Sequence, residues 1–311
     1  MTGMTSPTFI RPRVMRLKPH APPPQVTSPD TSSEGFLAAI QGVTGTAVLD
    51  GWPRDIEGVG PPCLPKAFEP FEQRLAYADG MTAFPKHLSL SLDVQLETPV
   101  AGLSSAAGGI EVHTEAGASV WTPSLVIAVP APTALRLLAP LVDQGREAGA
   151  VRALLGMIGS QACLTAIAGY PLDVARPSWD ICYPEDSAVV QMISHDSTKR
   201  AAPRCVVLVI QARPCWSLAH SEDREETWSA ELVSEASRIV GGWAARPSWV
   251  QAHRWRFARS DRGSELSRPL SLRVRGGGRV IVTGEAFAPG GGVEAAWLAG
   301  HASARRLIEE E

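Results

Sequence analysis

The chain has 311 residues, of which 44% are hydrophobic and 20% are charged, and its formal net charge at pH 7 is −3. This composition is typical of a globular protein with a sizeable core, and one large domain or two interleaved domains fit the length. The small net charge gives no overall reason to expect nucleic acid or an anionic membrane as a partner.

Cysteine and histidine usage argues against a disulfide framework and against a metal site. The five cysteines are odd in number, widely spaced and without a C-x-x-C pair, and the seven histidines are scattered. We therefore expect buried thiols, a reducing compartment and no metal. His253 is expected to be a satisfied polar residue. The adjacent His195 and Asp196 are not expected to form an acid/base pair, because neighbouring residues on a strand point to opposite faces.

The chain shows no candidate for a membrane span or a secretory signal. Its most apolar stretch, residues 125–142, is interrupted by three prolines and an arginine, which would break a spanning helix. Residues 1–29 lack a continuous apolar core and hold four basic residues, several prolines and no acid before Asp30. We predict a flexible, basic, proline-rich leader and a cytoplasmic protein, with an organellar transit peptide as the alternative.

From residue 30 to about residue 150 we predict short helices and an antiparallel ribbon. Apolar residues recur at helical spacing between residues 36 and 43, whereas residues 53–70 hold five prolines and are predicted to be a loop. A short helix is expected over residues 80–88, and another over residues 132–141. Alternating or continuous apolar residues predict strands at 93–100, 110–114 and 119–121, and a strand buried on both faces at 125–130.

The middle of the chain, residues 151–257, is predicted to form a second lobe of α+β type. Its helix at residues 225–240 places Trp228, Leu232 and Ala236 on one face, which is typical of a stripe that packs into a core. Strands are predicted at residues 162–170, 189–194 and 206–211.

The C-terminal segment carries the strongest functional signal. A buried strand is predicted at residues 280–283, followed by Gly284, Glu285 and the run Gly290–Gly292, and then by a helix. A strand that runs into a glycine-rich turn and a helix presents free backbone N–H groups and a positive helix end. Such a turn favours an anionic or electron-accepting ligand.

Three blocks of sequence, taken in their order along the chain, carry a resemblance to a known family. They are residues 77–88 with the strands that follow as far as residue 132, the run HRWRFA at residues 253–258, and the strand, turn and helix at 280–308. Together they resemble the renalase-type branch of the FAD-dependent amine oxidase superfamily, from about residue 30 to the end.

The resemblance implies an α+β fold derived from an α/β one. It would contain an incomplete FAD-binding domain of the amine-oxidase type, formed by residues 30–150 and 258–311. An antiparallel-sheet substrate lobe, residues 151–257, would be inserted in this domain.

The resemblance also implies the residues of a flavin site. Val100 would lie by the adenine, and Glu285, after Gly284, would hydrogen-bond the ribityl or adjoining phosphate region, where the family has aspartate. Trp255 would form a wall near the flavin ring, with Arg254 behind it. The turn before the last helix would face the pyrimidine edge of the flavin and stabilise negative charge there. The implied residues of this turn and helix start are Gly291, Gly292, Val293, Glu294, Ala295 and Ala296.

The chain departs from the family at its N-terminal end. The family's G-x-G-x-x-G, which precedes the helix near Phe36, occurs nowhere in the 311 residues. We therefore expect FAD binding to be conditional on a nucleotide-binding unit supplied by a partner chain, by a missing N-terminal segment or by a split gene. Without that unit the apolar faces of residues 125–129 and 280–282 would lack a neighbour, so a partner or self-association is expected.

Two functions remain open from the sequence. One is a renalase-like FAD-dependent oxidoreductase, for which the resemblance implies reduced nicotinamide nucleotides or their isomers as substrates and oxygen as the electron acceptor. Hydride transfer to flavin needs little from side chains beyond orientation and exclusion of water, so the lack of a nucleophile–base pair is compatible with it. The other is a non-catalytic pseudoenzyme that acts as an interaction or scaffold protein.

Overall fold

The computed structural model describes four stretches of the chain, residues 14–16, 33–58, 74–142 and 146–309. The chain divides into two compact units. Unit 1 comprises residues 1–38, 85–159 and 263–311, and unit 2 comprises residues 39–84 and 160–262. Both combine helices with mainly antiparallel sheets, so the predicted α+β class is confirmed.

The units differ in their bounds from the domains expected from the sequence. The expectation grouped residues 39–84 with the first domain and began the second lobe at residue 151, whereas residues 39–84 belong to unit 2 and its long segment begins at residue 160. The functions assigned to the two domains remain predictions.

Unit 1 contains three small sheets. The first has the order β15-β16-β9, in which β16 is antiparallel to β15 and parallel to β9. The second is the antiparallel ribbon β6-β7-β8, and the third is the pair β1-β5. The strands are β1 (Val14–Arg16), β5 (Asp93–Gln95), β6 (Val100–Ala106), β7 (Gly109–Thr114), β8 (Ser119–Thr122), β9 (Ser124–Ile127), β15 (Leu270–Arg273) and β16 (Arg279–Val282).

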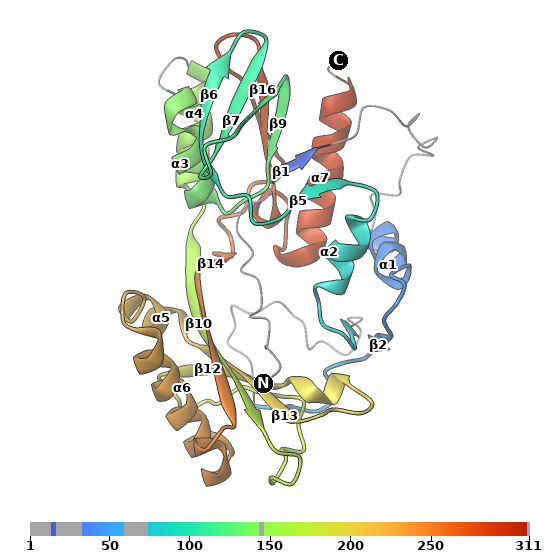
Figure 1. Cartoon of the computed structure of the whole chain (residues 1–311), viewed down its shortest axis with the longest axis vertical. Coiled ribbons are helices and arrows are strands. Elements are labelled where there is room, and N and C mark those ends of the chain that lie inside the picture. Colours follow the sequence, from blue (N-terminus) through green and yellow to red (C-terminus); the bar gives the residue numbers. More distant parts are fainter. Residues whose placement is uncertain (1–13, 17–32, 59–73, 143–145, 310–311) are drawn as a thin grey trace. The chain divides into compact units, whose positions relative to one another are not determined.

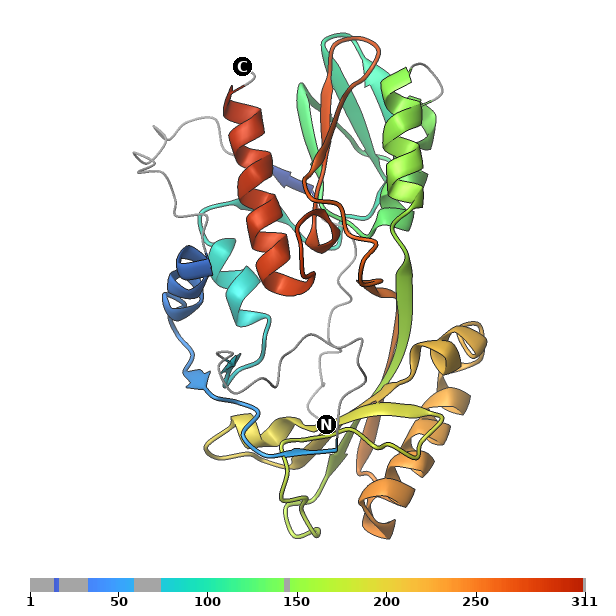
Figure 2. The ribbon, with the colours of Figure 1, turned by 180° about the vertical axis from the view of Figure 1, so that it is seen from behind.

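Helices flank the strands of unit 1. In Figures 1 and 2 the strands β6, β7, β9 and β16 lie between α3 and α4 on one side and α7 on the other. One core cluster joins these layers and includes Leu138, Leu155, Val280, Phe287 and Ala299. The helices are α3 (Ala131–Val142), α4 (Arg146–Gly156), the short η3 (Glu285–Phe287) and α7 (Gly292–Glu309), while α1 (Ser33–Gln41) and α2 (Ala83–Leu88) lie at the unit boundaries.

The strand β16 is buried along its whole length, and this corrects one expectation. Val280, Ile281 and Val282 are all 0% exposed. The strands β15 and β9 pair with the two edges of β16, and Val280 and Val282 pack in the core cluster of unit 1. The expectation that this segment lacks a neighbour is therefore wrong. The expectation that residues 125–130 are buried on both faces is wrong as well, because Val126 in β9 is 41% exposed.

Arg279, at the start of β16, holds the far end of α7. Its side chain is buried, and its Nη1 donates hydrogen bonds to the carbonyl oxygens of Arg306 (3.2 Å) and Leu307 (3.4 Å). These carbonyls belong to the last turn of α7, where an α-helix has no internal donors left. The guanidinium thus caps the C-terminal end of the helix and also favours its negative dipole end.

Unit 2 is built on a six-stranded sheet of order β14-β10-β13-β12-β11-β3. All neighbours are antiparallel except β11 and β3. A separate pair, β2-β4, accompanies it. The strands are β2 (Val48–Asp50), β3 (Ile56–Glu57), β4 (Leu75–Tyr77), β10 (Ser160–Tyr170), β11 (Ile181–Cys182), β12 (Val190–His195), β13 (Val206–Ala212) and β14 (Trp249–Ser260).

Helices cover one face of this sheet. They are α5 (Pro214–Ala219) and α6 (Glu225–Val240), and Figure 1 shows both on the same side of β10 and β14. Trp228, Leu232 and Ala236 of α6 are fully buried and pack in one cluster with Leu164 and Ile210 of the sheet. The predicted core stripe of this helix is confirmed. Two short 3₁₀ helices complete the unit, η1 (Asp196–Lys199) and η2 (Gly242–Ala245).

Several local expectations differ from the structure. The strand expected at residues 93–100 is broken into β5 and β6, because Glu97 has a positive φ of 55° and turns the chain. The expected loop at residues 53–70 contains β3, and residues 59–73 lie outside the described residues. The pairing of β1 with β5 was not anticipated in the leader.

The cysteines are less uniformly buried than expected. Cys182 is buried, but Cys163 and Cys205 are half-buried and Cys215 is exposed, and all four are free thiols. Cys63 lies outside the described residues. Within the described stretches, none of the helices has the length and apolar character that a membrane crossing requires, and no group of three or more His, Cys, Asp or Glu residues could hold a metal ion.

Two leucines of unit 2 test the location of its core. Leu232→Ala in α6 removes a side chain with 0% exposure, and we expect it to lower the free energy of unfolding by about 2–5 kcal/mol. Leu218→Ala in α5 removes one that is 70% exposed, so a change within about 0.5 kcal/mol is expected. Urea unfolding followed by circular dichroism measures both, and equal losses would contradict this assignment of the core.

Candidate functional site

In unit 1 the C-terminal end of β16 leads directly to the start of α7. Thr283 and Gly284 follow the strand, η3 comes next, and three consecutive glycines precede the body of the helix. Figure 2 shows η3 and the first turn of α7 beside each other. The structure therefore has the strand, turn and helix that the sequence predicted.

The glycine turn leaves open space beside its backbone. Gly284, Gly290, Gly291 and Gly292 all have positive φ, between 66° and 142°. A Cβ built on Gly284, Gly290 or Gly292 would meet no atom within 4 Å, and one on Gly291 would meet only Oε1 of Glu265, at 3.8 Å. Such conformations favour glycine. The missing side chains leave room for another molecule to approach the backbone.

The first turn of α7 supplies backbone donors that have no acceptor within the helix. Because α7 begins at Gly292, the N–H groups of Gly292, Val293 and Glu294 lie where a helix has no internal acceptors. Oε2 of Glu285 accepts a hydrogen bond from Gly292 N, at 3.3 Å. Ala296 lies a full turn inside the helix, so its N–H is a weaker candidate for a ligand contact than those ahead of it.

One buried hydroxyl beside this turn has no partner. Thr283 is 4% exposed, and its Oγ1 makes no hydrogen bond with any of the described residues. A buried hydroxyl without a partner costs free energy, so natural structures rarely keep one without reason. Thr283 directly precedes Gly284, which makes it a candidate group for a polar ligand at the start of α7.

The predicted adenine contact, Val100, is the first residue of β6. Its side chain is half-buried and packs against the core cluster of unit 1. The contact with adenine stays a prediction.

In unit 2 the sheet has a second face, opposite α5 and α6. Along β10, Leu164 and Ala166 are fully buried under the helices. Successive side chains on a strand point to opposite faces, so Cys163 and Thr165 lie on the other one. We call this opposite side the open face of the unit 2 sheet.

A row of polar and soft side chains crosses the open face. The register pairs Thr165 of β10 with His253 of β14 on one side and with Gln211 of β13 on the other, and Gln211 pairs with Met192 of β12. The row therefore offers a hydroxyl, an imidazole, an amide and a thioether. Such groups can orient a ligand by hydrogen bonds and contacts without requiring that the ligand carry a charge.

An indole and a thiol lie next to this row. Trp255 pairs with Cys163 in the register and is 39% exposed. The rings of His253 and Trp255 meet edge to face, with centroids 4.6 Å apart and an interplanar angle of 71°. Sγ of Cys163 lies 3.5 Å from Oγ1 of Thr165. Burial raises the pKa of this thiol, although Thr165 and the charge of Arg259 act in the opposite direction.

The structure places Trp255 and Arg254 on opposite faces of β14. Arg254 is the next residue on the strand, so it points to the opposite face. There its Nη2 donates to the carbonyl oxygen of Asp223, at 2.8 Å, just before α6. Of the two flavin-proximal candidates only Trp255 lies on the open face.

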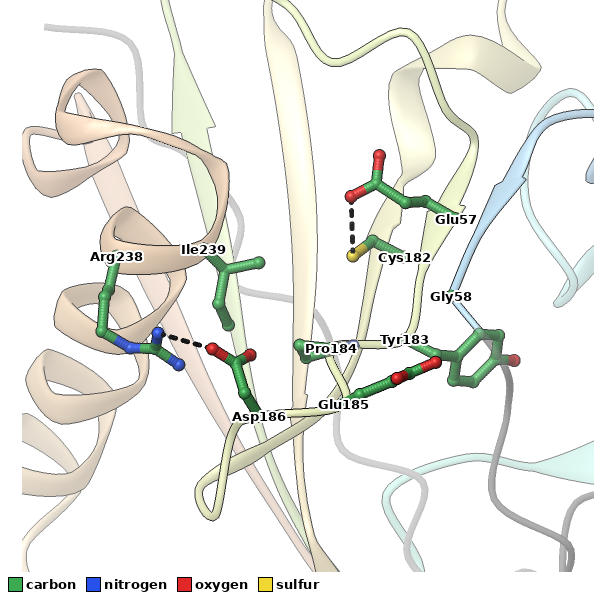
Figure 3. A pocket seen from close by; sticks show the side chains of 9 residues that line it. All are labelled: Glu57, Gly58, Cys182, Tyr183, Pro184, Glu185, Asp186, Arg238 and Ile239. Carbon is green, nitrogen blue, oxygen red and sulfur yellow. Dashed lines mark hydrogen bonds and ion pairs between the residues drawn. The ribbon is translucent and has the colours of Figure 1, made fainter.

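A cavity of about 300 Å³ lies at the edge of unit 2 (Figure 3). Its lining includes Glu57, whose Oε1 is 3.9 Å from Sγ of Cys182, and Asp186, which forms an ion pair with Arg238 at 3.2 Å. Burial, reinforced by Glu57, raises the pKa of Cys182 to about 11. This thiol therefore stays protonated near neutral pH and is a poor nucleophile.

Sequence reasoning missed the carboxylate that faces His195. His195 is 4% exposed, and burial lowers its pKa, although the charge of Asp180 opposes the shift. Oδ2 of Asp180 accepts hydrogen bonds from the backbone N–H groups of Arg54 (2.7 Å) and Asp55 (3.4 Å). Asp196 forms ion pairs with Lys199 and the following arginine.

The predicted site residues thus lie in both units. The nine predicted cofactor residues belong to unit 1, where Gly284 and those from Glu285 to Ala296 lie along one turn and helix start, and Trp255 and Arg254 belong to unit 2. Thr283, Cys163 and Arg259 were not predicted. A register that places Cys163 beside Trp255 depends on the pairing of two strands far apart in the sequence, which no local motif reveals.

Comparison with known proteins agrees with this architecture. The model of the family described as flavin containing amine oxidoreductase matches residues 49–308. The chain therefore belongs to this family. No protein of curated function matches it.

Similar solved structures show the same fold. A triple mutant of putrescine oxidase has a TM-score of 0.55 at 17% identity, over 77% of this chain and 54% of that one. Cyclohexylamine oxidase from Brevibacterium oxydans IH-35A has a TM-score of 0.52 at 16% identity, over 69% of this chain and 49% of that one. The chain thus spans about half the length of the solved structures that it matches.

The lowered pKa of His195 predicts how the stability of unit 2 depends on pH. Below the unfolded-state pKa of about 6.5, the unfolded chain binds a proton that buried His195 does not, so stability should fall as pH is lowered from about 7 to 5. His195→Gln should flatten this part of the profile. The further loss in stronger acid should remain, because Asp180 and Asp196 also have lowered pKa values.

Urea unfolding at a series of pH values measures this profile. An unchanged slope between pH 7 and 5 in His195→Gln would show that His195 does not carry the effect.

Proposed function

We propose that this chain is a renalase-like FAD-dependent oxidoreductase. In this proposal the first turn of α7 holds the isoalloxazine end of the cofactor. A nucleotide-binding unit from outside this sequence holds the phosphates. Family membership supports flavin chemistry in general. The observation that carries the finer proposal is the open turn at Gly290–Gly292 beside the unpartnered hydroxyl of Thr283.

The residues at this turn fit the flavin end of FAD. The N–H groups at the start of α7 can donate to the pyrimidine edge, and the positive end of the helix favours negative charge there. The hydroxyl of Thr283 can gain a partner that it lacks among the described residues. When bound, FAD accepts a hydride from the substrate.

The phosphate end of the cofactor needs residues that this sequence does not contain. No G-x-G-x-x-G occurs in it. In unit 1, β9 is an edge strand among the described strands, and it is parallel to β16. An edge strand offers unpaired backbone groups to a further strand. We propose that the first strand of the nucleotide-binding unit, in the same polypeptide or in a partner, pairs with β9.

The proposed substrate and electron acceptor follow from the resemblance to renalase-type proteins. Reduced nicotinamide nucleotides or their isomers would be oxidised, with oxygen as the electron acceptor. On the open face of unit 2, Trp255 and His253 offer rings against which a planar substrate can stack. Gln211, which is half-buried, can orient it by hydrogen bonds.

The proposal is tested by the visible absorption spectrum of the purified chain with added FAD, alone and together with a candidate nucleotide-binding protein. Bound oxidised flavin that is bleached by a reduced nicotinamide nucleotide is the expected result for the complete complex. Failure to retain flavin under both conditions would leave the scaffold protein as the better description.

Thr283→Val separates a ligand-binding role of the hydroxyl from a structural one. Removing a buried group without a partner should raise the free energy of unfolding of the flavin-free chain by about 1 kcal/mol. The same change should weaken flavin binding about tenfold, because one hydrogen bond to the ligand is lost.

The matched control is Ser303→Ala in α7. Its buried hydroxyl already donates to the carbonyl oxygen of Ala299, at 2.7 Å. This control should lose stability by about 1 kcal/mol and bind flavin unchanged. Thermal unfolding and flavin titration measure both properties. A Thr283→Val chain that is less stable and binds flavin normally would rule out the proposed role.

A further inference from the structure

The four longest strands of the unit 2 sheet carry no carboxylates. The sequences of β10 (SQACLTAIAGY), β12 (VQMISH), β13 (VVLVIQA) and β14 (WVQAHRWRFARS) contain neither Asp nor Glu. An ammonium group brought to the open face would therefore find no opposite charge on these four strands. Since a cation is costly to remove from water without a partner, the face is poorly suited to a cationic amine.

One arginine on this face lacks a charged partner. Arg259 of β14 is half-buried and pairs in register with Gln161 of β10, and its Nε donates to Oε1 of Gln161, at 3.0 Å. Among the described residues this is the one hydrogen bond of its side chain, and no carboxylate lies within ion-pair distance. Arg259 thus keeps four N–H donors on its two terminal nitrogens without a partner in the described part of the chain.

Some other arginines of unit 2 have carboxylate partners. Arg256, on the opposite face of β14, forms an ion pair with Glu222. Arg238 and Arg200 also have carboxylate partners. Arg213 and Arg254 bind backbone carbonyl oxygens instead. Arg259 differs from these two in that its side chain is held by an amide.

The charge of Arg259 acts on two other side chains. It opposes the burial that raises the pKa of Cys163 and the burial that raises the pKa of Tyr183 to about 12. Cys163 is the register partner of Trp255. A planar guanidinium held by an amide can bind a carboxylate or phosphate through two parallel hydrogen bonds, and an exposed indole on the same strand can stack on a ring of the ligand.

We propose that Arg259 determines the substrate class of the open face. It selects a molecule with a planar ring and a carboxylate or phosphate group over an alkylammonium compound. The catalytic use of this selection rests on the proposed function, whereas the binding preference itself does not.

The test uses four probes that share one ring and differ in charge. Benzoate and phenyl phosphate are anionic, benzyl alcohol is neutral, and benzylamine is cationic at pH 7. Their dissociation constants for the full chain, without flavin, are measured by calorimetry or ligand-observed NMR. At least one anion should bind about tenfold more tightly than benzylamine, the effect expected from one charge-assisted contact. The better anion also distinguishes carboxylate from phosphate as the preferred group.

Variants of Arg259, with Arg256 as the control position, then show whether Arg259 causes the preference for anions. Arg259→Gln should weaken binding of the preferred anion about tenfold and change that of benzyl alcohol less than about twofold. Arg259→Lys should retain part of the preference, because it keeps the charge but not the planar fork. Arg256→Gln removes an equal charge from the opposite face of the same strand, so it should leave all four constants unchanged. Thermal unfolding confirms that each variant is folded.

Several outcomes would overturn the proposal. They are tighter binding of benzylamine than of both anions, no binding of either anion at millimolar concentration, and equal losses in Arg256→Gln and Arg259→Gln. If Arg259→Gln fails to fold, the wild-type series and Arg259→Lys still decide the question. A chain that prefers anions but never retains FAD would refute the proposed function alone. A flavin-binding chain that prefers benzylamine would refute the role of Arg259 alone.

Discussion

The complete burial of β16 is the constraint on which the candidate flavin site depends. A strand flanked on both sides and covered by apolar side chains has one register and one direction, since a slip by one residue would turn its buried groups outward. The chain that leaves Val282 therefore has a fixed starting point. The glycines that follow can adopt positive φ without strain, so the turn and the first residues of α7 are placed by the core rather than by a ligand.

In unit 2, the buried apolar side chains are concentrated on one face of the sheet. Its sheet satisfies the hydrophobic requirement on one face, where Trp228 and Leu232 of α6 fill the core. The other face is thereby released from the need to be apolar and can carry a thiol, amides, an imidazole and a guanidinium. Polar side chains on a rigid sheet hold their positions better than those on a loop, which suits a face that discriminates between ligands.

The sequence predicted what depends on local periodicity and missed what depends on distant pairing. The stripe of α6 and the apolar run of β16 are visible in the sequence because their spacing alone defines a buried face. The exposure of Val126 was not visible, because it depends on which strands flank β9. Arg259 was missed for a similar reason. Its neighbour Gln161 lies 98 residues away, beyond an irregularity in the pairing of β10 and β14.

The arginine that caps α7 links the start of β16 to the end of that helix. Arg279 begins β16 and binds the last turn of α7, while the end of β16 leads into the first turn of the same helix. Strand and helix are therefore joined at both ends and should open as one cooperative unit. Occupation of the first turn of α7 would then slow amide hydrogen exchange along the whole helix, including residues near Leu307 that no ligand touches.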